Sequence, residues 1–169
     1  GKMKPIANKL IAGLAIASLG WEGQIRLRSN DFSGALHAYL DQYAAGATNA
    51  ALSLRVAASR LVQASSDQRL AVARDPLLRR VVTAWILSAA TSAFDWAEDA
   101  GAPNSSSALA EAWLDTVEAS GAGEVALAES MSVLAYHAGR WSTAERWVGL
   151  AGDSAVAAWI RSKLLLREG

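Results

Sequence analysis

The sequence predicts an all-α protein. Alanine and leucine supply much of its hydrophobic content, which is 52% of 169 residues, and both are strong helix formers. Proline occurs only three times, and no segment shows the sustained period-two alternation of a half-buried strand. Capping residues and glycines separate segments of about 8 to 20 residues, the usual length of globular helices. We expect residues 1–169 to form a single helical domain.

Caps and stops delimit the expected helices of the first half. The first helix has Pro5 in its first turn and ends before Asn30. Asp31 follows, and its carboxylate accepts from the free N–H groups of the second helix. Asp75-Pro76 is a further start signal, an N-cap acid followed by proline. The expected helices cover residues 5–28, 32–45, 48–62, with Thr48 as cap, 66–73 and 76–90.

In the second half, glycines end most segments. Gly121 to Gly123, Gly139 and Gly152 each interrupt a helical pattern. The loop APNSSS at 102–107 is short, so it does not indicate a domain boundary. The helices expected here cover residues 92–100, 106–119, 124–138, 142–150 and 155–167. About ten helices with such short joints predict antiparallel neighbours.

The start of the chain differs in composition from the rest. Three of the four lysines lie in the first nine residues, before an apolar run from Leu10 to Leu19. This arrangement resembles a secretory signal peptide, although the run is too short to span a bilayer. We favour a buried first helix and leave a cytoplasmic or periplasmic location open. The Arg- and Ala-rich composition suggests a bacterial protein.

Charge and cysteine content exclude several classes of protein. The 16 basic and 16 acidic residues cancel, and no basic stripe stands out in the sequence, so nucleic acid is not an expected partner. The absence of cysteine removes disulfides, thiolate chemistry and most structural zinc sites.

The sequence contains no catalytic motif. His37 and His137 do not stand in a metal-binding spacing, and neither a nucleophile elbow nor a phosphate-binding loop occurs. His137 lies near a helix end, where a positive charge suits the helix dipole. The acidic pairs Glu98-Asp99 and Asp115/Glu118 are expected to be solvated. We therefore expect no enzymatic activity, no cofactor and no metal in this chain.

Other conspicuous side chains are expected to serve structure. Arg79-Arg80 indicates a solvated or salt-bridged helix face. The tryptophans are expected to pack between helices rather than to form ligand cages. They are Trp21, Trp85, Trp96, Trp113, Trp141, Trp147 and Trp159.

Two stretches share one pattern, NDFSGALHAYLDQ from Asn30 and GRWSTAERWVGLA from Gly139. Each begins with a residue that tolerates left-handed backbone geometry. An aromatic residue follows two positions later, an alanine three positions after that, and a large apolar residue four positions further on. The pattern predicts a helical hairpin in which the aromatic side chain fills the gap and the alanine permits close approach. Such hairpins bury a continuous core by stacking.

The pattern resembles the second half of a tetratricopeptide repeat, G-x-Y-x-x-A-x-x-x-Y-x-x-A. Gly23 and Ser132 also match the small residue seven positions before the turn. The resemblance covers about residues 16–45 and 125–153, whereas residues 48–120 fit poorly. Leu19 and Glu22 replace the family's tryptophan and leucine. The resemblance implies antiparallel helical hairpins stacked in a right-handed tetratricopeptide-like superhelix.

The resemblance also implies a binding groove. In this family the first helices of successive units line a concave surface. Carried over by position, the groove residues are Gln24, Arg28, Glu129, Tyr136, His137, Trp159, Lys163 and Arg167. Ordinary packing between repeats would explain the same residue types.

We therefore expect a non-catalytic scaffold that binds a protein or peptide. Two alternatives stay open. The chain is a structural or assembly module of a larger bacterial envelope or secretion protein, with self-association possible, or it is an accessory domain of an enzyme that lies outside these residues. Gly169 falls where a further turn glycine is expected, 30 residues after Gly139, which suggests a fragment of a longer repeat protein.

Overall fold

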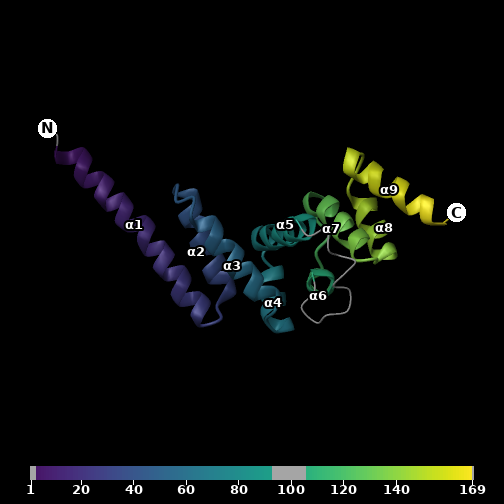
Figure 1. Cartoon of the computed structure of the whole chain (residues 1–169), viewed down its shortest axis with the longest axis horizontal. Coiled ribbons are helices and arrows are strands. Elements are labelled where there is room, and N and C mark those ends of the chain that lie inside the picture. The colour runs from purple at the N-terminus through teal and green to yellow at the C-terminus, as the bar shows by residue number, and fades with distance from the viewer. Residues whose placement is uncertain (1–2, 93–105, 169) are drawn as a thin grey trace. The chain divides into compact units, whose positions relative to one another are not determined.

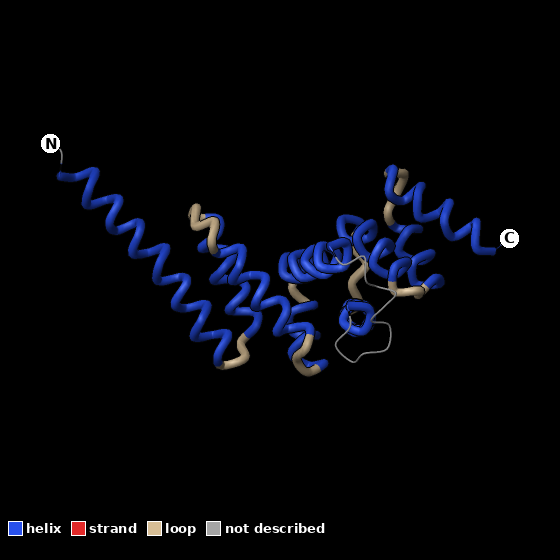
Figure 2. Tube along the Cα trace, viewed as in Figure 1, coloured by secondary structure: helices blue, strands red, loops and turns tan. Residues whose placement is uncertain are grey.

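The structure is a computed structural model that describes the backbone of residues 3–92 and 106–168 and the side chains of residues 9–89 and 108–167. Figure 2 shows helices joined by short loops, and the described residues contain no strand. The expected all-α class is therefore confirmed. Nine helices are described: α1 (Met3–Arg28), α2 (Phe32–Ala44), α3 (Ala50–Val62), α4 (Ser66–Ala73), α5 (Pro76–Ser92), α6 (Ser106–Ala119), α7 (Val125–His137), α8 (Trp141–Leu150) and α9 (Ala155–Glu168).

Most helix boundaries agree with the sequence prediction to within two residues. Asp31 accepts a hydrogen bond from Gly34 N–H at 2.9 Å, as expected for the cap of α2. Asp75 likewise accepts from the first N–H groups of α5. Helix α3 begins at Ala50, one residue later than a cap at Thr48 predicts, so Thr48 is not its cap. The helix predicted over residues 92–100 falls outside the described residues, apart from Ser92, which ends α5.

The chain divides into two compact units, residues 1–61 and residues 62–169. The first contains α1, α2 and nearly all of α3, and the second contains α4 to α9. Figure 1 labels these helices along the chain. Among the described residues, no helix combines the length and the apolar content needed to cross a membrane.

The first unit is built on the hairpin of α1 and α2. Ala35 and Leu36 of α2 are fully buried against α1, and Phe32 is buried at the turn. Gly23 of α1 lies directly against the ring of Tyr39, where a Cβ atom would approach ring carbons to 2.4 Å. The small residue and the alanine that the repeat pattern required are thus both at the helix contact, because any larger side chain would separate the two helices.

The second unit is organised around α7, which contacts α5, α6, α8 and α9. The hairpin of α7 and α8 buries Ala144 completely, as the first hairpin buries Ala35. The largest buried side chains among the described residues are Trp113 of α6 and Trp147 of α8. Each tryptophan also has a polar partner for its ring N–H: Thr83 for Trp113, at 2.9 Å, and Glu118 for Trp147, at 2.7 Å.

The two hairpin turns have the same backbone geometry. Asn30 and Gly139 both adopt left-handed conformations, with φ of 61° and 72°. In each turn the residue after the left-handed one donates its N–H to a carbonyl group in the last turn of the helix. Asp31 N–H donates to Arg26 O, and Arg140 N–H donates to Ala135 O, each at 2.9 Å. This is the Schellman arrangement that satisfies the last carbonyl groups of a helix. The left-handed turn residues predicted from the sequence are therefore confirmed.

We expect Gly139→Ala to lower the free energy of unfolding by about 1 to 2 kcal/mol, because a Cβ atom disfavours the left-handed backbone. Gly149, which is helical and has open space around it, is the matched control. Gly149→Ala is expected to raise stability by about 0.5 to 1 kcal/mol, since alanine favours helix over glycine. Urea denaturation of both variants measures the difference, and effects of the same sign would contradict the prediction.

The tryptophans differ in their surroundings more than the sequence suggested. Trp113 and Trp147 pack in the core as predicted, and Trp85 and Trp141 are half-buried. The packing prediction is wrong for Trp21, whose side chain is 68% exposed on α1. Trp96 lies outside the described residues. Gly23, two residues further along α1, contacts Tyr39 of α2, so Trp21 lies on the opposite side of the helix and is left exposed.

Arg79 has a structural role that the doublet Arg79-Arg80 did not reveal. Arg80 is exposed, whereas Arg79 is buried, donates to Ala73 O at the end of α4, and pairs with Glu124 just before α7. Burial lowers the pKa of Arg79 below its ordinary value, and the nearby charge of Asp75 opposes that shift. One guanidinium thus links α4, α5 and the start of α7.

Candidate functional site

Three aromatic side chains meet on the surface of the second unit. Tyr136, in the last turn of α7, lies at the centre, with its ring centroid 5.2 Å from that of Trp141 and 5.9 Å from that of Trp159. Both contacts are edge-on, an arrangement that aromatic rings favour. Trp159 is 45% exposed and the other two rings are half-buried, so the cluster offers apolar area to solvent.

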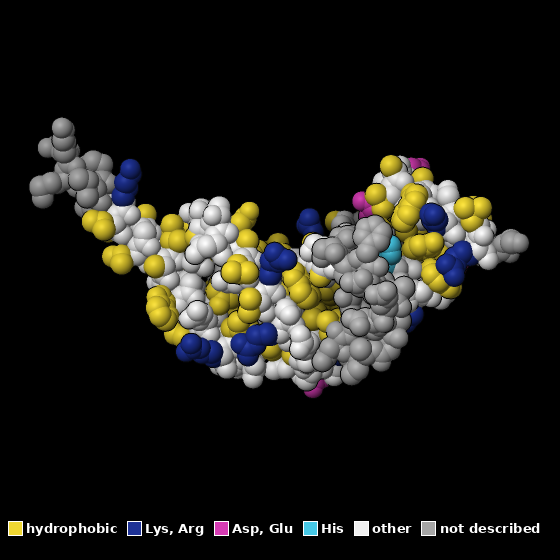
Figure 3. Space-filling model, in the orientation of Figure 1, with side chains coloured by type: hydrophobic (Ala, Val, Ile, Leu, Met, Phe, Trp, Pro, Cys, Tyr) yellow, Lys and Arg dark blue, Asp and Glu magenta, His cyan; other side chains and the backbone are white. Residues whose placement is uncertain are grey.

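Two cations from the last turns of α9 stand over these rings. The guanidinium of Arg167 lies 3.7 Å from the centroid of Trp141, and the ammonium of Lys163 lies 5.8 Å from that of Trp159. Both are within the range of a cation–π interaction. No ion pair engages either cation among the described residues. We call these five residues, Tyr136, Trp141, Trp159, Lys163 and Arg167, the aromatic–cationic surface, and Figure 3 shows dark-blue cations among yellow side chains over α9.

Four of the predicted groove residues therefore come together here, and two others, Glu129 and His137, lie on the same helix as Tyr136. Glu129 of α7 accepts from the hydroxyl of Ser154, which in turn caps α9 by accepting from Ala157 N–H at 3.0 Å. Glu129 thus positions α9. His137 lies beside Tyr136, with ring centroids 6.0 Å apart.

The environment of His137 differs from the sequence expectation. Partial burial lowers the pKa of His137 below its ordinary value, because desolvation disfavours the charged imidazolium. The imidazole is therefore more easily kept neutral in the folded protein than in the unfolded chain.

This shift predicts a pH effect on stability. The unfolded chain, with a histidine pKa of about 6.5, binds the proton more readily than the folded protein. The contribution of His137 to the free energy of unfolding is therefore fully present above that pH. It is lost as the pH falls through the lower pKa of the folded state. We expect the stability difference between the wild type and His137→Gln to shift against the wild type as the pH is lowered from 8 towards 5. Urea denaturation across that range measures it, and a constant difference would contradict the prediction.

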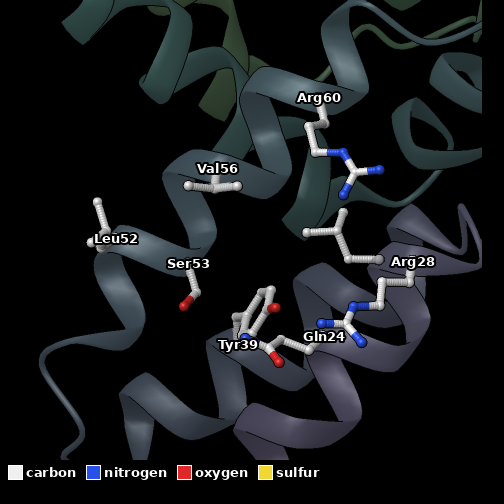
Figure 4. A pocket seen from close by; sticks show the side chains of 8 residues that line it. Gln24, Arg28, Tyr39, Leu52, Ser53, Val56 and Arg60 are labelled. Atoms are coloured by element: carbon white, nitrogen blue, oxygen red, sulfur yellow. The ribbon is translucent and has the colours of Figure 1, made fainter.

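A second feature is a cavity of about 300 Å³ within the first unit. It opens between the C-terminal turns of α1, the middle of α2 and one face of α3. Figure 4 shows the lining side chains, with Arg28 and Arg60 extending into the space from α1 and α3. The lining residues are Gln24, Leu27, Arg28, Tyr39, Leu52, Ser53, Val56 and Arg60.

The cavity accounts for the two remaining groove residues, Gln24 and Arg28. Leu52 and Val56 of α3 are exposed and form the apolar wall of this cavity. Leu61 of the same helix is buried. That all eight predicted residues belong to one groove stays a prediction.

The acidic pair Asp115/Glu118, which was expected to be solvated, is engaged in structural contacts. Asp115 pairs with Arg140 at 3.0 Å, and Glu118 pairs with Arg146 while accepting from the ring N–H of Trp147. These contacts join α6 to α8 and the turn before it. The other pair, Glu98-Asp99, lies outside the described residues. Among the described residues, no group of three His, Asp or Glu side chains is arranged as a metal site.

Sequence reasoning missed several residues of both features. From the sequence, Trp141 was expected only to fill the gap between the two helices of its hairpin. Its stacking with Arg167 depends on the packing of α9 against α8, which the repeat pattern does not show. Tyr39, Ser53 and Arg60 join the cavity because α3 faces α1, which no local pattern indicates. Comparison of the chain with models of known protein families, with curated proteins and with solved structures found no match.

Proposed function

We propose that this protein is a non-catalytic helical scaffold that binds a peptide segment of a partner protein at the aromatic–cationic surface. The observation that carries the proposal is the gathering of Tyr136, Trp141 and Trp159 under two cations with no acidic partner among the described residues. Aromatic residues and arginine are the side chains that most often dominate binding at protein interfaces.

The geometry favours a peptide with an acidic residue next to an apolar one. A guanidinium stacked on a ring keeps its N–H edge available for a carboxylate, because the stacking uses only its flat face. The indole of Trp159 adds exposed apolar area a short distance along α9. The rings also restrict the two long cationic side chains, which reduces the entropy lost when they bind.

We also propose that the hairpins belong to a tetratricopeptide-like superhelix. Support comes from the shared pattern, the equivalent turns at Asn30 and Gly139, and the buried alanine at the same position of each hairpin. In such an arrangement, first helices of successive hairpins present the binding residues. Both α1 and α7, the first helices here, carry predicted groove residues.

The peptide proposal is tested by selection followed by affinity measurement. A displayed library of random peptides is selected on the immobilised protein, and the enriched peptides are measured by fluorescence anisotropy. We expect Trp159→Ala and Arg167→Glu each to weaken binding about tenfold or more. Trp21→Ala and Arg80→Glu are matched controls, since Trp21 and Arg80 are exposed outside the surface. Absence of enrichment, or equal losses in the controls, would refute the proposal.

A second candidate is the assembly module, and one observation favours it. Helix α1 exposes a row of large apolar side chains, and Figure 3 shows hydrophobic side chains along it. The row comprises Leu10, Ile11, Leu14, Trp21 and Ile25. Exposed apolar area of this kind marks contact sites on proteins. Light scattering after size exclusion tests it: a dimer that dissociates in Leu14→Lys supports self-assembly, and a monomer at all concentrations opposes it.

A further inference from the structure

The polar groups that line the cavity of the first unit are matched to a negative charge. The guanidinium groups of Arg28 and Arg60, the amide of Gln24 and the hydroxyl groups of Ser53 and Tyr39 all supply N–H or O–H donors. None of the described residues that line the cavity is an aspartate or a glutamate. Within the described residues, neither Arg28 nor Arg60 forms an ion pair. Among the described residues, the two positive charges at the cavity therefore have no acidic partner.

The charge of the whole first unit points the same way. The chain is neutral overall, but residues 1–61 contain seven lysines and arginines against three aspartates and glutamates. Two of those three acids, Glu22 and Asp31, are paired with Arg26 and are not available to the cavity. An excess of positive charge raises the local concentration of anions and speeds their association.

Tyr39 gives the cavity a neutral donor at its base. Its ring is buried against Gly23, and Figure 4 shows it beside Gln24. Burial raises the pKa of Tyr39, with the charge of Arg60 opposing the shift, so the hydroxyl keeps its proton at neutral pH. A protonated hydroxyl can donate to an oxyanion without adding charge. No hydrogen bond to this hydroxyl is formed within the described part of the chain.

We propose that this cavity binds a phosphomonoester attached to a small apolar group. The charge of such a group, close to −2 at neutral pH, balances Arg28 and Arg60, and its oxygens accept from the paired N–H groups of a guanidinium. Leu27, Leu52 and Val56 form an apolar wall for the attached group. A volume of about 300 Å³ lies at the lower end of the range for small-ligand sites. The proposal does not depend on peptide binding by the second unit.

Isothermal titration calorimetry with phenyl phosphate tests the proposal on the full chain. Benzoate, which has the same ring and a single charge, and inorganic phosphate, which lacks the ring, are the comparison ligands. We expect saturable binding of phenyl phosphate at pH 7.5, at least about tenfold tighter than binding of either comparison ligand. The affinity is expected to fall as salt is raised. No saturation at millimolar ligand, or equal affinity for benzoate, would overturn the proposal.

Variants locate the binding. Arg28→Gln and Arg60→Gln are each expected to weaken phenyl phosphate binding about tenfold or more, because each removes a charge-assisted contact. Arg55→Gln is the matched control, since Arg55 is an exposed arginine of α3 that does not line the cavity. Tyr39→Phe, which keeps the ring, is expected to cause a smaller loss. An equal loss in Arg55→Gln would show general attraction to surface charge and would overturn the proposal.

The source of the phosphomonoester is distinguished by a second pair of ligands. A short peptide with one phosphoserine is compared with free phosphoserine under the same conditions. Tighter binding of the peptide, again lost in Arg60→Gln, assigns the cavity to phosphorylated proteins. Equal affinities assign it to small phosphorylated molecules. Binding of either ligand that survives both arginine variants would overturn the proposal.

Discussion

Replacing Trp113 with alanine is expected to lower the free energy of unfolding by about 3 to 5 kcal/mol. The indole of Trp113, on α6, is fully buried, and its N–H donates to the hydroxyl of Thr83 on α5 at 2.9 Å. The substitution leaves a cavity that neighbouring helices cannot close, and it removes a buried hydrogen bond. Urea denaturation followed by circular dichroism measures the effect.

Trp21→Ala is the matched control for Trp113→Ala. It removes the same atoms from an exposed position, so it is expected to change stability by no more than about 0.5 kcal/mol. Trp113→Phe, which retains most of the buried volume, is expected to lie between the two. If Trp21→Ala proved as costly as Trp113→Ala, the contrast in burial between the two side chains would be wrong.

Gly23→Ala is expected to destabilise the first unit by about 1 to 3 kcal/mol, the usual cost of an overpacked contact. A Cβ atom at this position would stand 2.4 Å from a ring carbon of Tyr39. The ring must then move into the adjoining cavity or the hairpin must open. Hydrogen exchange at the amides of α2 measures the loss, and weaker binding of phenyl phosphate is expected to accompany it.

Gly13→Ala provides the control in the same helix. Gly13 has open space around it, so its substitution brings only the better helix propensity of alanine. We expect it to stabilise α1 by about 0.5 to 1 kcal/mol. Opposite signs for Gly13→Ala and Gly23→Ala would demonstrate the close contact with Tyr39, and equal signs would contradict it.

Much of the local structure was predictable because its causes are local. Asp31 and Asp75 cap helices through bonds to N–H groups two or three residues away. Gly139 and Asn30 end helices because their backbones tolerate positive φ. The cap of α4 shows the limit of this reasoning. The start of this helix at Ser66 was predicted correctly, but the capping box that Ser65 and Gln68 form there was not recognised.

The candidate sites were only partly predictable. The repeat pattern selected Tyr136, Trp159, Lys163 and Arg167, and the structure brings these four together. Trp141 and Arg60 were missed as site residues because their partners come from other helices. The burial of Arg79 was missed for the same reason, since its two contacts lie at the end of α4 and before α7.

The sequence by itself therefore determined the helical class, most helix boundaries and the two hairpin turns. These depend on propensity, capping and backbone geometry within a few residues of each position. Only the tertiary structure decided which tryptophans are buried, which arginines lack an acidic partner, and that α3 closes a cavity against α1 and α2. Those features depend on contacts between residues far apart in the chain. A helical pattern in the sequence does not show which other helix each of its faces contacts.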